Sequence, residues 1–528
     1  MERKPCDLVM KGGITSGIVY PRAVCELAKH YRFANIGGTS AGAIAAALTA
    51  AAEYRRQKGS DDGFAKLEQL PEWLAKDNHL LGLFQPDDDT APLMDVALRA
   101  LQSPWSALRA LLAHFHRFGG AAAAVGALVL AFSWRNPVSS AYVVIVTAIA
   151  FVLASVIELI VYALRVLPRH RYGLCSGAGA TALTEWLATQ IEEVAGSDHP
   201  LTFKDLEDAD VRLSVMTTNL THGRPYRLPF ESKQFLFAEK DFRELFPKRV
   251  VDYMIARSTM RSGFYLFPQE DLPIIVAARM SLSFPLLLTA VPLYASDFGR
   301  RDRDYTPELC WFSDGGITSN FPVHFFDAPL PRWPTFAINL NQRSTRYHED
   351  GQRIFAPTTN RSGIVEWWRS IETLPSFLWS IVATMQNWHD NMLLRMPGYR
   401  DRIAHVLLAE DEGGLNLGMD PKTITDVAER GREAARTLIE RFGGEGWRNH
   451  QWIRFLSFMR GLDDAAVEFA RGYDEQLLDE TTALPSYDIG NERGVIRDKA
   501  RAFAKLAEKH SGKRRPRPRA VLRAMPEI

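Results

Sequence analysis

The sequence has few cysteines, no excess of either charge and no long apolar run near its first residues. Its four cysteines form no CxxC or CxxH pair, which argues against a zinc site and a disulfide framework and fits a reducing compartment. A formal net charge of +1 gives no indication of a nucleic-acid partner. The opening stretch MERKPCDLVMKGG lacks the apolar region of a secretory signal, so we expect the bulk of the chain to be cytoplasmic.

Hydrophobic residues make up 46% of the 528 positions, enough for a sizeable core and roughly two to four ordinary domains. Near the beginning, short apolar runs alternate with helical patterns. We expect strands at 7–10 and 32–36, a helix from residue 18 with Pro21 in its first turn, and an alanine-rich helix over 42–58. This alternation predicts an α/β fold with a parallel sheet and right-handed crossovers.

Two apolar stretches, at about 119–134 and 138–164, predict a helical hairpin. The second contains one acidic residue, Glu158, and exceeds the roughly 20 residues needed to cross a hydrocarbon core. Basic residues lie outside both ends of the hairpin, whereas its turn carries one arginine, so we expect both flanks on the cytoplasmic side of a membrane. The alternatives are a helical pair buried in a soluble core and a re-entrant hairpin that enters one leaflet.

A serine between small residues precedes the alanine-rich helix, in the pentapeptide Gly38-Thr39-Ser40-Ala41-Gly42. This G-x-S-x-G pattern is typical of a nucleophile on a sharp strand-to-helix turn, where neighbouring chains leave no room for side chains. Ser40 then lies at a helix N-terminus, where N–H groups favour developing negative charge. The alternative is a structural turn without catalytic function.

Two more glycine-containing loops follow predicted strands. In the loop at 11–17, Gly12 and Gly13 allow backbone N–H groups to turn inward, which suits an oxyanion hole. A phosphate-binding loop is disfavoured because neither G-x-x-x-x-G-K-[ST] nor G-x-G-x-x-G occurs there. The second loop, Ser313-Asp314-Gly315-Gly316, follows the apolar run LCWF, so we expect Asp314 at the same sheet edge as Ser40.

Taken in this order, the glycine loop, GTSAG and DGG resemble the patatin-like phospholipases, lipid acyl hydrolases with a Ser/Asp dyad. The resemblance covers roughly residues 5–340, with the hairpin as an insertion, and extends to LTFKDL at 201–206, LSVMTTNLTHGRPY at 213–226 and AARMSLSFPLLLTAV at 277–291. It implies a three-layer α/β sandwich with a mainly parallel central sheet and no metal or cofactor. By the same resemblance the nucleophile is Ser40, the base is Asp314, the oxyanion hole comprises Gly12, Gly13, Ile14 and Ala41, and the supporting glycines are Gly38, Gly42, Gly315 and Gly316.

The loop at 11–17 departs from the family pattern of three consecutive glycines followed by a basic residue. Ile14 stands in place of the third glycine and Ser16 in place of the basic residue. A dyad or triad with histidine is the rival arrangement, since a general hydrolase has Ser, Asp and His in chain order. His324 and, with less support, His222 are the candidates, and a structural role is the preferred interpretation of both.

The composition also suggests where the chain divides. We expect the N-terminal part of the catalytic domain at 1–100, the hairpin insertion at 101–172, the remainder of the catalytic domain at 173–345, a helix-rich C-terminal region at 346–508 and a basic, disordered tail at 509–528. Aromatic and aliphatic residues recur at helical spacing over 363–395, which indicates either core packing or an amphipathic helix that faces lipid.

The sequence thus predicts a membrane-associated serine lipid acyl hydrolase, phospholipase A-like, that cleaves carboxylic esters of lipids through an acyl-enzyme. Its partners would be a lipid ester and the bilayer, and not nucleic acid. Two alternatives remain open: a catalytically weak patatin-like scaffold at the membrane, and a soluble carboxylesterase with a buried hairpin.

Overall fold

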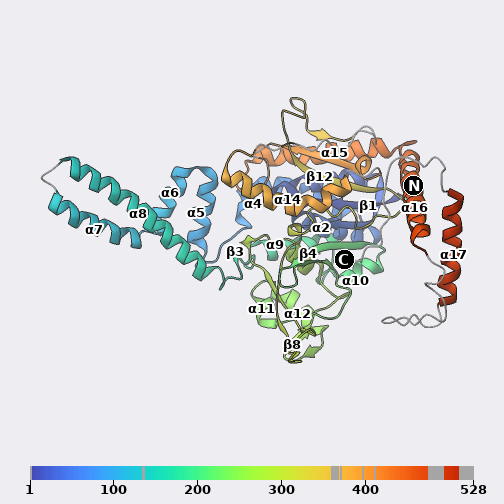
Figure 1. The fold of residues 1–528 in the computed structure, drawn as a ribbon, viewed down its shortest axis with the longest axis horizontal. Helices are drawn as coiled ribbons and strands as arrows, with labels where there is room; N and C mark the ends of the chain where they lie inside the picture. The colour runs from blue at the N-terminus through green and yellow to red at the C-terminus, as the bar shows by residue number, and fades with distance from the viewer. Residues whose placement is uncertain are drawn as a thin grey trace.

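A large mixed sheet forms the centre of the protein (Figure 1). The computed structural model describes residues 3–133, 137–357, 368, 371–394, 398–409, 412–414, 416–473 and 493–510. The strand order is β13-β14-β12-β1-β2-β4-β11-β10-β6-β8-β7, with β5 paired to β4, and a separate pair joins β3 and β9. The strands are β1 Lys4–Met10, β2 Tyr31–Gly38, β3 Gly173–Cys175, β4 Arg212–Asn219, β5 Arg224–Leu228, β6 Leu236–Phe237, β7 Met260–Arg261, β8 Phe264–Leu266, β9 Leu286–Leu288, β10 Val291–Ala295, β11 Glu308–Asp314, β12 Thr335–Gln342, β13 Ile354–Phe355 and β14 Ile403–Leu408.

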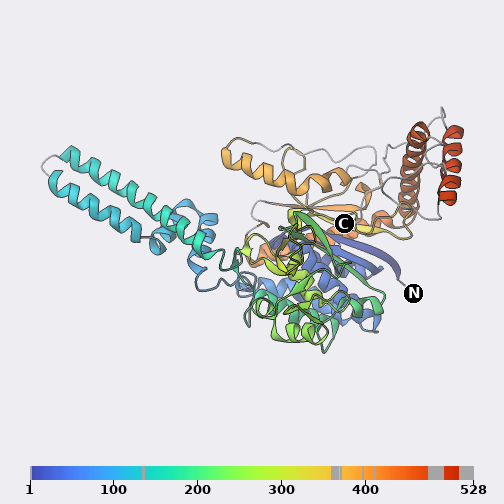
Figure 2. The same cartoon turned by 60° about the horizontal axis from the view of Figure 1, so that its bottom comes forward.

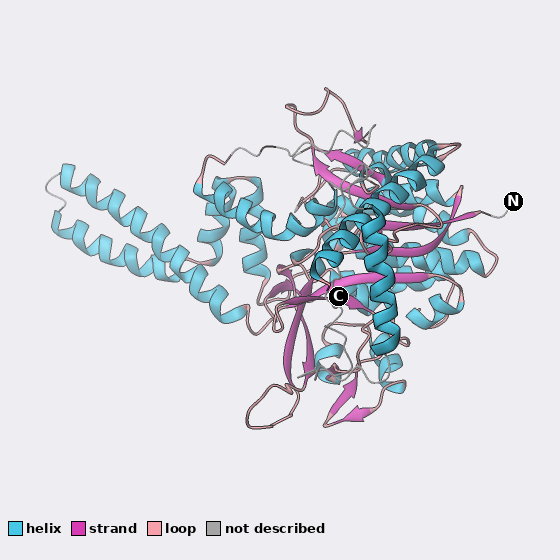
Figure 3. Ribbon diagram, turned by 45° about the vertical axis from the view of Figure 1, so that its right-hand side comes forward, coloured by secondary structure: helices cyan, strands magenta, loops and turns pink. Residues whose placement is uncertain are grey.

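Helices lie around this sheet and form the arm that projects from it (Figure 3). The α-helices are α1 Tyr20–Ala28, α2 Ala41–Gln57, α3 Asp62–Ala75, α4 His79–Gly82, α5 Ala91–Gln102, α6 Pro104–His114, α7 Arg117–Ser133, α8 Pro137–Val166, α9 Leu183–Ala195, α10 Phe203–Asp208, α11 Glu239–Arg243, α12 Lys248–Ala256, α13 Ile274–Ser281, α14 Leu374–Leu394, α15 Pro421–Phe442, α16 Gly446–Gly472 and α17 Arg493–His510. Short 3₁₀ turns are η1 Thr15–Val19, η2 Gly315–Ile317 and η3 Arg400–Arg402.

The sheet is parallel only in part. Strands β14, β12, β1, β2 and β4 are neighbours and run parallel, as the alternation near the beginning of the chain predicts. Beyond β4 the sheet continues with antiparallel pairs, starting with β11 and β10. The α/β class is therefore confirmed, and the parallel part is the one that carries the predicted nucleophile.

The two faces of β1 bury different cores because successive side chains of a strand point to opposite faces. Leu8 and Met10 belong to the large cluster that includes residues of α1, α2 and α15. Val9 faces a smaller cluster on the other side, with Phe321, Val323, Ala337, Tyr399 and Ile403. The central strands are therefore buried on both faces, which explains their continuous apolar runs.

The predicted hairpin is formed by α7 and α8, which project from the core (Figure 1). Close packing of the two helices requires glycine, since a Cβ on Gly126 would lie 2.2 Å from Thr147 Oγ1. Only 6% of the most apolar window of α8 is buried, so the alternative of a hairpin buried in the core does not hold for the described residues. By length and composition α8 is long enough to cross a membrane; α7, shorter, qualifies only together with α6, to which it is joined at a bend of 86°.

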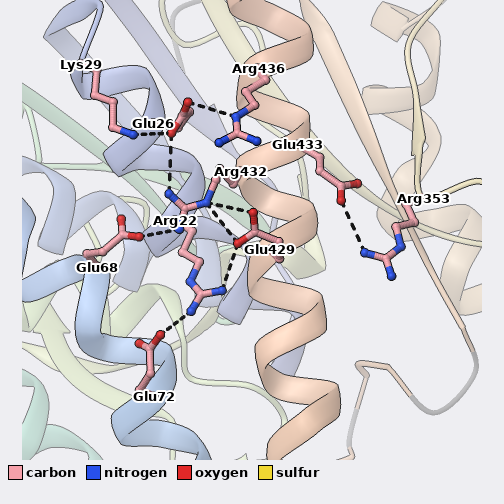
Figure 4. Close-up of polar contacts among 10 residues, drawn as sticks. All are labelled: Arg22, Glu26, Lys29, Glu68, Glu72, Arg353, Glu429, Arg432, Glu433 and Arg436. Carbon is pink, nitrogen blue, oxygen red and sulfur yellow. Dashed lines mark hydrogen bonds and ion pairs between the residues drawn. The ribbon is translucent and has the colours of Figure 1, made fainter.

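The segment after residue 345 contributes to the same sheet and to the helices that cover it. Strand β14 pairs with β12, and α15 lies along α1. An ion-pair network joins these helices to α3: Arg22 bonds Glu72 and Glu429, and Arg432 bonds Glu68 and Glu429 (Figure 4). The predicted division at residue 345 stays a prediction, and of the predicted basic tail only residues 509 and 510 are described, as the end of α17.

Candidate active site

Ser40 lies on the sharp turn between β2 and α2. Its backbone has φ 53° and ψ −129°, a conformation that costs a residue other than glycine about 1–3 kcal/mol and that persists where the surroundings enforce it. The glycines around it provide the space. A Cβ on Gly42 would lie 2.4 Å from Met10 O, and a Cβ on Gly38 would lie 2.3 Å from Gly42 O. The structure thus places Ser40 as the G-x-S-x-G pattern predicts, with Gly38 and Gly42 at close backbone contacts.

Asp314 reaches the edge of Ser40 by a different route from the one expected. Strand β11 runs antiparallel to β4, with Asp314 opposite Thr217. Val215 of β4 lies opposite Gly38, the last residue of β2, and β4 continues past this point to Asn219. Strand β11 pairs with this continuation of β4 over three residue pairs and then ends. An antiparallel strand therefore brings its last residue to the carboxyl end of β2, since it stops early.

Burial dominates the electrostatics of Asp314. The side chain is buried, and this raises the pKa of its carboxyl to about 7, although the Ser40 hydroxyl and the Gly316 N–H lower it in part. Oδ1 accepts a hydrogen bond from Gly316 N at 2.6 Å, and Oδ2 is buried without a hydrogen-bond partner in the described part of the chain. A Cβ on Gly315 would lie 2.1 Å from Met216 O, so this turn also requires glycine. The carboxyl is thus suited to exchange a proton near neutral pH.

The loop at 11–17 lies against Ser40 in an unexpected orientation. The carbonyl oxygen of Gly13 accepts hydrogen bonds from Ala41 N at 3.2 Å and from Ser40 Oγ at 3.4 Å. Since C=O and N–H of one trans peptide point in opposite directions, the N–H of Ile14 points away from Ser40. Gly12 N donates to Asn320 O at 2.8 Å. The N–H groups of Gly12 and Ala41 therefore have protein acceptors, and the N–H of Ile14 points away. Of the four predicted oxyanion residues, this leaves Gly13 as the one whose N–H has no protein acceptor among the described residues and does not belong to the peptide that is turned away.

Sequence reasoning missed two residues that hold these turns. Ser281 Oγ accepts the Ser40 N–H at 3.1 Å, and Ser281 lies in the small-residue segment 277–291 that carried part of the family resemblance. Asn320 O accepts from Gly12 N and also from Thr39 Oγ1 at 2.9 Å, and thereby joins the loop to the turn of Ser40. No motif or periodicity in the sequence marks Asn320.

The two candidate histidines are held by other contacts. His222 Nδ1 lies 2.7 Å from Tyr226 Oη, and its Nε2 lies 3.7 Å from Cys310 Sγ. His324 packs edge-on against Phe325, with ring centroids 5.4 Å apart. Neither imidazole is among the groups that set the pKa of Asp314. The geometry therefore favours the Ser40/Asp314 pair over an arrangement with histidine.

Comparisons with known proteins identify the family of this chain. The chain matches the family described as Patatin-like phospholipase over residues 8–327. It is 36% identical to the RpoH suppressor of Rhizobium meliloti (strain 1021), in an alignment of 632 positions that covers 99% of this chain and 98% of that protein.

Among solved structures, the type III effector protein ExoU aligns with 96% of this chain at 15% identity and a TM-score of 0.22, and the chain covers 63% of that effector. This TM-score is too low to relate the two folds. The family match and the R. meliloti relative show that the chain belongs to the patatin-like phospholipase family and is a carboxylic ester hydrolase.

Proposed function

We propose that this protein is a membrane-associated lipid acyl hydrolase, phospholipase A-like, in which Ser40 is the nucleophile and Asp314 the general base. The observation that carries the proposal is the pairing of a serine on a strained glycine turn with a buried carboxyl whose pKa is raised to about 7. A carboxyl with an ordinary pKa is a weaker base at neutral pH, whereas one near 7 is partly ionised and still accepts a proton readily.

In the first half of the reaction Ser40 Oγ attacks the ester carbonyl while its proton passes to Asp314. The tetrahedral intermediate collapses, the ester C–O bond breaks, and Asp314 returns the proton to the leaving alcohol. Water then attacks the acyl-serine, gives up a proton to Asp314 and releases the fatty acid, with the proton returning to Ser40. Asp314 thus accepts and returns the proton in both halves of the reaction, because no second proton carrier contacts Ser40 in the described geometry.

The oxyanion of each intermediate requires donors that the present conformation only partly provides. Rotation of the Gly13–Ile14 peptide would turn the Ile14 N–H toward Ser40 and release the Ala41 N–H from Gly13 O. We include this rotation in the proposal, with Gly13, Ile14 and Ala41 as the resulting donors. Gly12 acts through its tie to Asn320.

The apolar hairpin supports membrane association. Along α8, exposed apolar side chains include Val138, Ile145, Leu153 and Leu164, a distribution suited to contact with lipid and not with water. Basic residues flank the hairpin on the side of the core, which is consistent with a cytoplasmic catalytic domain. The substrate in this proposal is a lipid ester of the same bilayer.

The experiment that tests this function is labelling by a fluorophosphonate probe together with fatty-acid release from phospholipid vesicles. We expect wild type to be labelled, Ser40→Ala to lose both signals, and Asp314→Asn to lose roughly two to four orders of magnitude of release, the usual contribution of a general base. Ser60→Ala, at a half-buried serine in the loop between α2 and α3, is the matched control. Labelling that persists in Ser40→Ala would contradict the assignment of the nucleophile.

A catalytically weak membrane scaffold is the second candidate function. The observation that favours it is the Gly13 carbonyl, which faces Ser40 where an oxyanion donor is needed. Absence of both labelling and release by wild type, over several lipids and pH values, would establish the scaffold in place of the enzyme.

A further inference from the structure

Helix α14 has the reverse of the usual distribution of side chains. Its exposed residues include Leu374, Phe377, Leu378, Ile381 and Met385, of which Phe377 is 51% and Met385 71% exposed. Positions 374, 377, 378, 381 and 385 share one face of a helix with 3.6 residues per turn. The opposite face carries Ala383 and Asp390, which are buried. An apolar face of this size in water is unfavourable unless another apolar surface covers it.

Helix α15, which is of similar length, shows the ordinary arrangement. It buries Ile424, Val427 and Leu438 against the core and carries its charged residues in the network with α1 and α3 (Figure 4). The reversed polarity of α14 is therefore not shared by α15.

Asp390, on the buried face of α14, holds the segment that follows the Asp314 turn. Its Oδ2 accepts the backbone N–H groups of Asn320 and Phe321, each at 2.8 Å, and its Oδ1 accepts the Ser319 hydroxyl at 2.8 Å. Asp390 is 2% exposed, so these bonds are formed away from water and hold the segment firmly.

Asn320 carries this connection into the active site. The same residue whose N–H is bound by Asp390 accepts Gly12 N and Thr39 Oγ1 at its carbonyl oxygen. Its side chain also lies beside the dyad, because a Cβ on Gly316 would be 2.8 Å from both Asn320 Oδ1 and Asp314 Oδ1. Movement of α14 would therefore move the loop that has to supply oxyanion donors.

The position of α14 agrees with a contact to lipid. In Figures 1 and 2, α14 lies on the side of the core from which the hairpin of α7 and α8 projects. A bilayer on this side of the core could therefore contact both the hairpin and the exposed face of α14.

We propose that the exposed apolar face of α14 docks on the lipid bilayer, and that Asp390 positions the oxyanion loop through Asn320, so that docking and the geometry at Ser40 are coupled. This inference rests on the proposed function, because it assigns the lipid surface that presents the substrate. Asp390 is a positioning residue, since it contacts neither Ser40 nor Asp314 in the described structure. The occupant is a bilayer because the family's substrates are lipid esters and because a continuous apolar helix face matches the interfacial zone of a membrane.

Docking is tested independently of catalysis in the full chain carrying Ser40→Ala. Met385→Cys is labelled with an environment-sensitive fluorophore, and the four native cysteines are buried and therefore protected from the reagent. Vesicles of phosphatidylcholine and phosphatidylglycerol should shift the emission to shorter wavelength. Phe298→Cys, at an equally exposed aromatic in the loop between β10 and β11, is the control and should shift little. An unchanged emission at position 385, or a shift that appears without vesicles as protein concentration rises, would overturn docking on lipid; the latter result would indicate a second copy of the chain.

Coupling is tested by kinetics on two substrates. Phe377→Ser combined with Met385→Ser should leave fluorophosphonate labelling in solution unchanged and lower fatty-acid release from vesicles by about tenfold or more, because two large apolar side chains leave the contact. Asp390→Ala should lower kcat on a water-soluble short-chain ester with little change in KM, and Asp390→Asn should recover part of the loss.

Asn387→Ala is the matched control for Asp390 on the same helix, because among the described residues the Asn387 side chain bonds the Ala383 carbonyl of its own helix alone. Wild-type kcat in Asp390→Ala, or an equal loss in Asn387→Ala, would contradict the positioning role. If wild type is neither labelled nor active, the proposed function fails, and the emission of the labelled Ser40→Ala chain still decides whether α14 docks on lipid.

Discussion

Two turns meet at the active site, and they differ in how closely they follow their motifs. The turn of Ser40 has glycine at each position where a Cβ would strike the backbone, and Ser40 has the strained conformation of a nucleophile. The loop at 11–17 has Ile14 in place of a glycine, and its Gly13 carbonyl points at Ser40. In the proposed mechanism, the Ser40 turn already has the conformation needed for attack, whereas the Gly13–Ile14 peptide has to rotate before the loop can stabilise an oxyanion.

In the proposed mechanism, the nucleophile and the oxyanion donors therefore lie on two turns that differ in how firmly they are held. The Ser40 turn is fixed by steric exclusion within 38–42 and by β1, and neither changes with the surroundings. The loop is joined to its surroundings by individual hydrogen bonds, from Gly12 N to Asn320 O, from Thr15 N to Gly414 O and from Ala41 N to Gly13 O. Such bonds exchange at a lower cost in free energy than a core packing change. A change of conformation is therefore easier in the loop than in the Ser40 turn.

The largest effect is expected from adding a methyl group to the Ser40 turn. Gly42→Ala places a Cβ 2.4 Å from Met10 O, so we expect complete loss of fluorophosphonate labelling and a fall of about 1–3 kcal/mol or more in the free energy of unfolding. Denaturant unfolding and labelling measure the two effects. Gly82→Ala, where a Cβ would meet nothing within 4 Å, should be nearly neutral. A stable, fully labelled Gly42→Ala would show that steric exclusion does not set this turn.

The next largest effect is the pH dependence of kcat/KM, which arises from the ionisation of Asp314 and not from the loop. With a pKa of about 7, Asp314 is half ionised at pH 7 and mostly protonated below it, so kcat/KM should rise about tenfold per pH unit well below 7 and reach a plateau above 7. A profile flat from pH 5 to 9 would contradict the role of Asp314 as the base.

The same pKa has a consequence for stability. The folded-state pKa is above the ordinary 3.8, so the protonated form favours folding, and this stabilisation is complete below about pH 4 and is lost as pH rises through 7. Asp314→Asn should therefore gain stability over wild type with rising pH, by on the order of 2–4 kcal/mol between pH 4 and 8. Urea unfolding at both pH values measures the change, and a pH-independent difference would argue against a buried, near-neutral carboxyl.

The smallest expected effect concerns the Gly13–Ile14 peptide of the loop at 11–17. Rotating the Gly13–Ile14 peptide by about 180° moves the φ of Ile14 from −102° into the positive region, which costs a β-branched residue about 1–2 kcal/mol or more. Ile14→Gly removes this cost, and we expect kcat to rise roughly fivefold. Ile14→Ala keeps the Cβ and should stay near wild type. An Ile14→Gly enzyme no faster than Ile14→Ala would show that the rotation does not limit the reaction.

Much of the fold and part of the site could be predicted from the sequence. Helix α2 at Ala41–Gln57 and the hairpin helices α7 and α8 lie close to their expected bounds, because local composition specifies long helices strongly. The antiparallel course of β11 was not predictable, since an apolar run of four residues carries no information about the direction of its partner. Asn320 and Ser281 were missed as ties between the turns because their contacts are to residues remote in sequence.

The position of Ser40 is predictable from the local sequence, because Gly38 and Gly42 on either side of it leave no room for a larger side chain. The sequence also determined the apolar character of the hairpin and the family to which the chain is similar. The remaining properties depend on contacts between segments that are distant in the sequence. The pKa of Asp314 depends on burial by several strands, and the Gly13 carbonyl is turned toward Ser40 by contacts within the fold. Asp390 is connected to the loop at 11–17 through Asn320, which bonds both Asp390 and Gly12. These properties arise where distant segments meet and exclude water, so no local pattern encodes them.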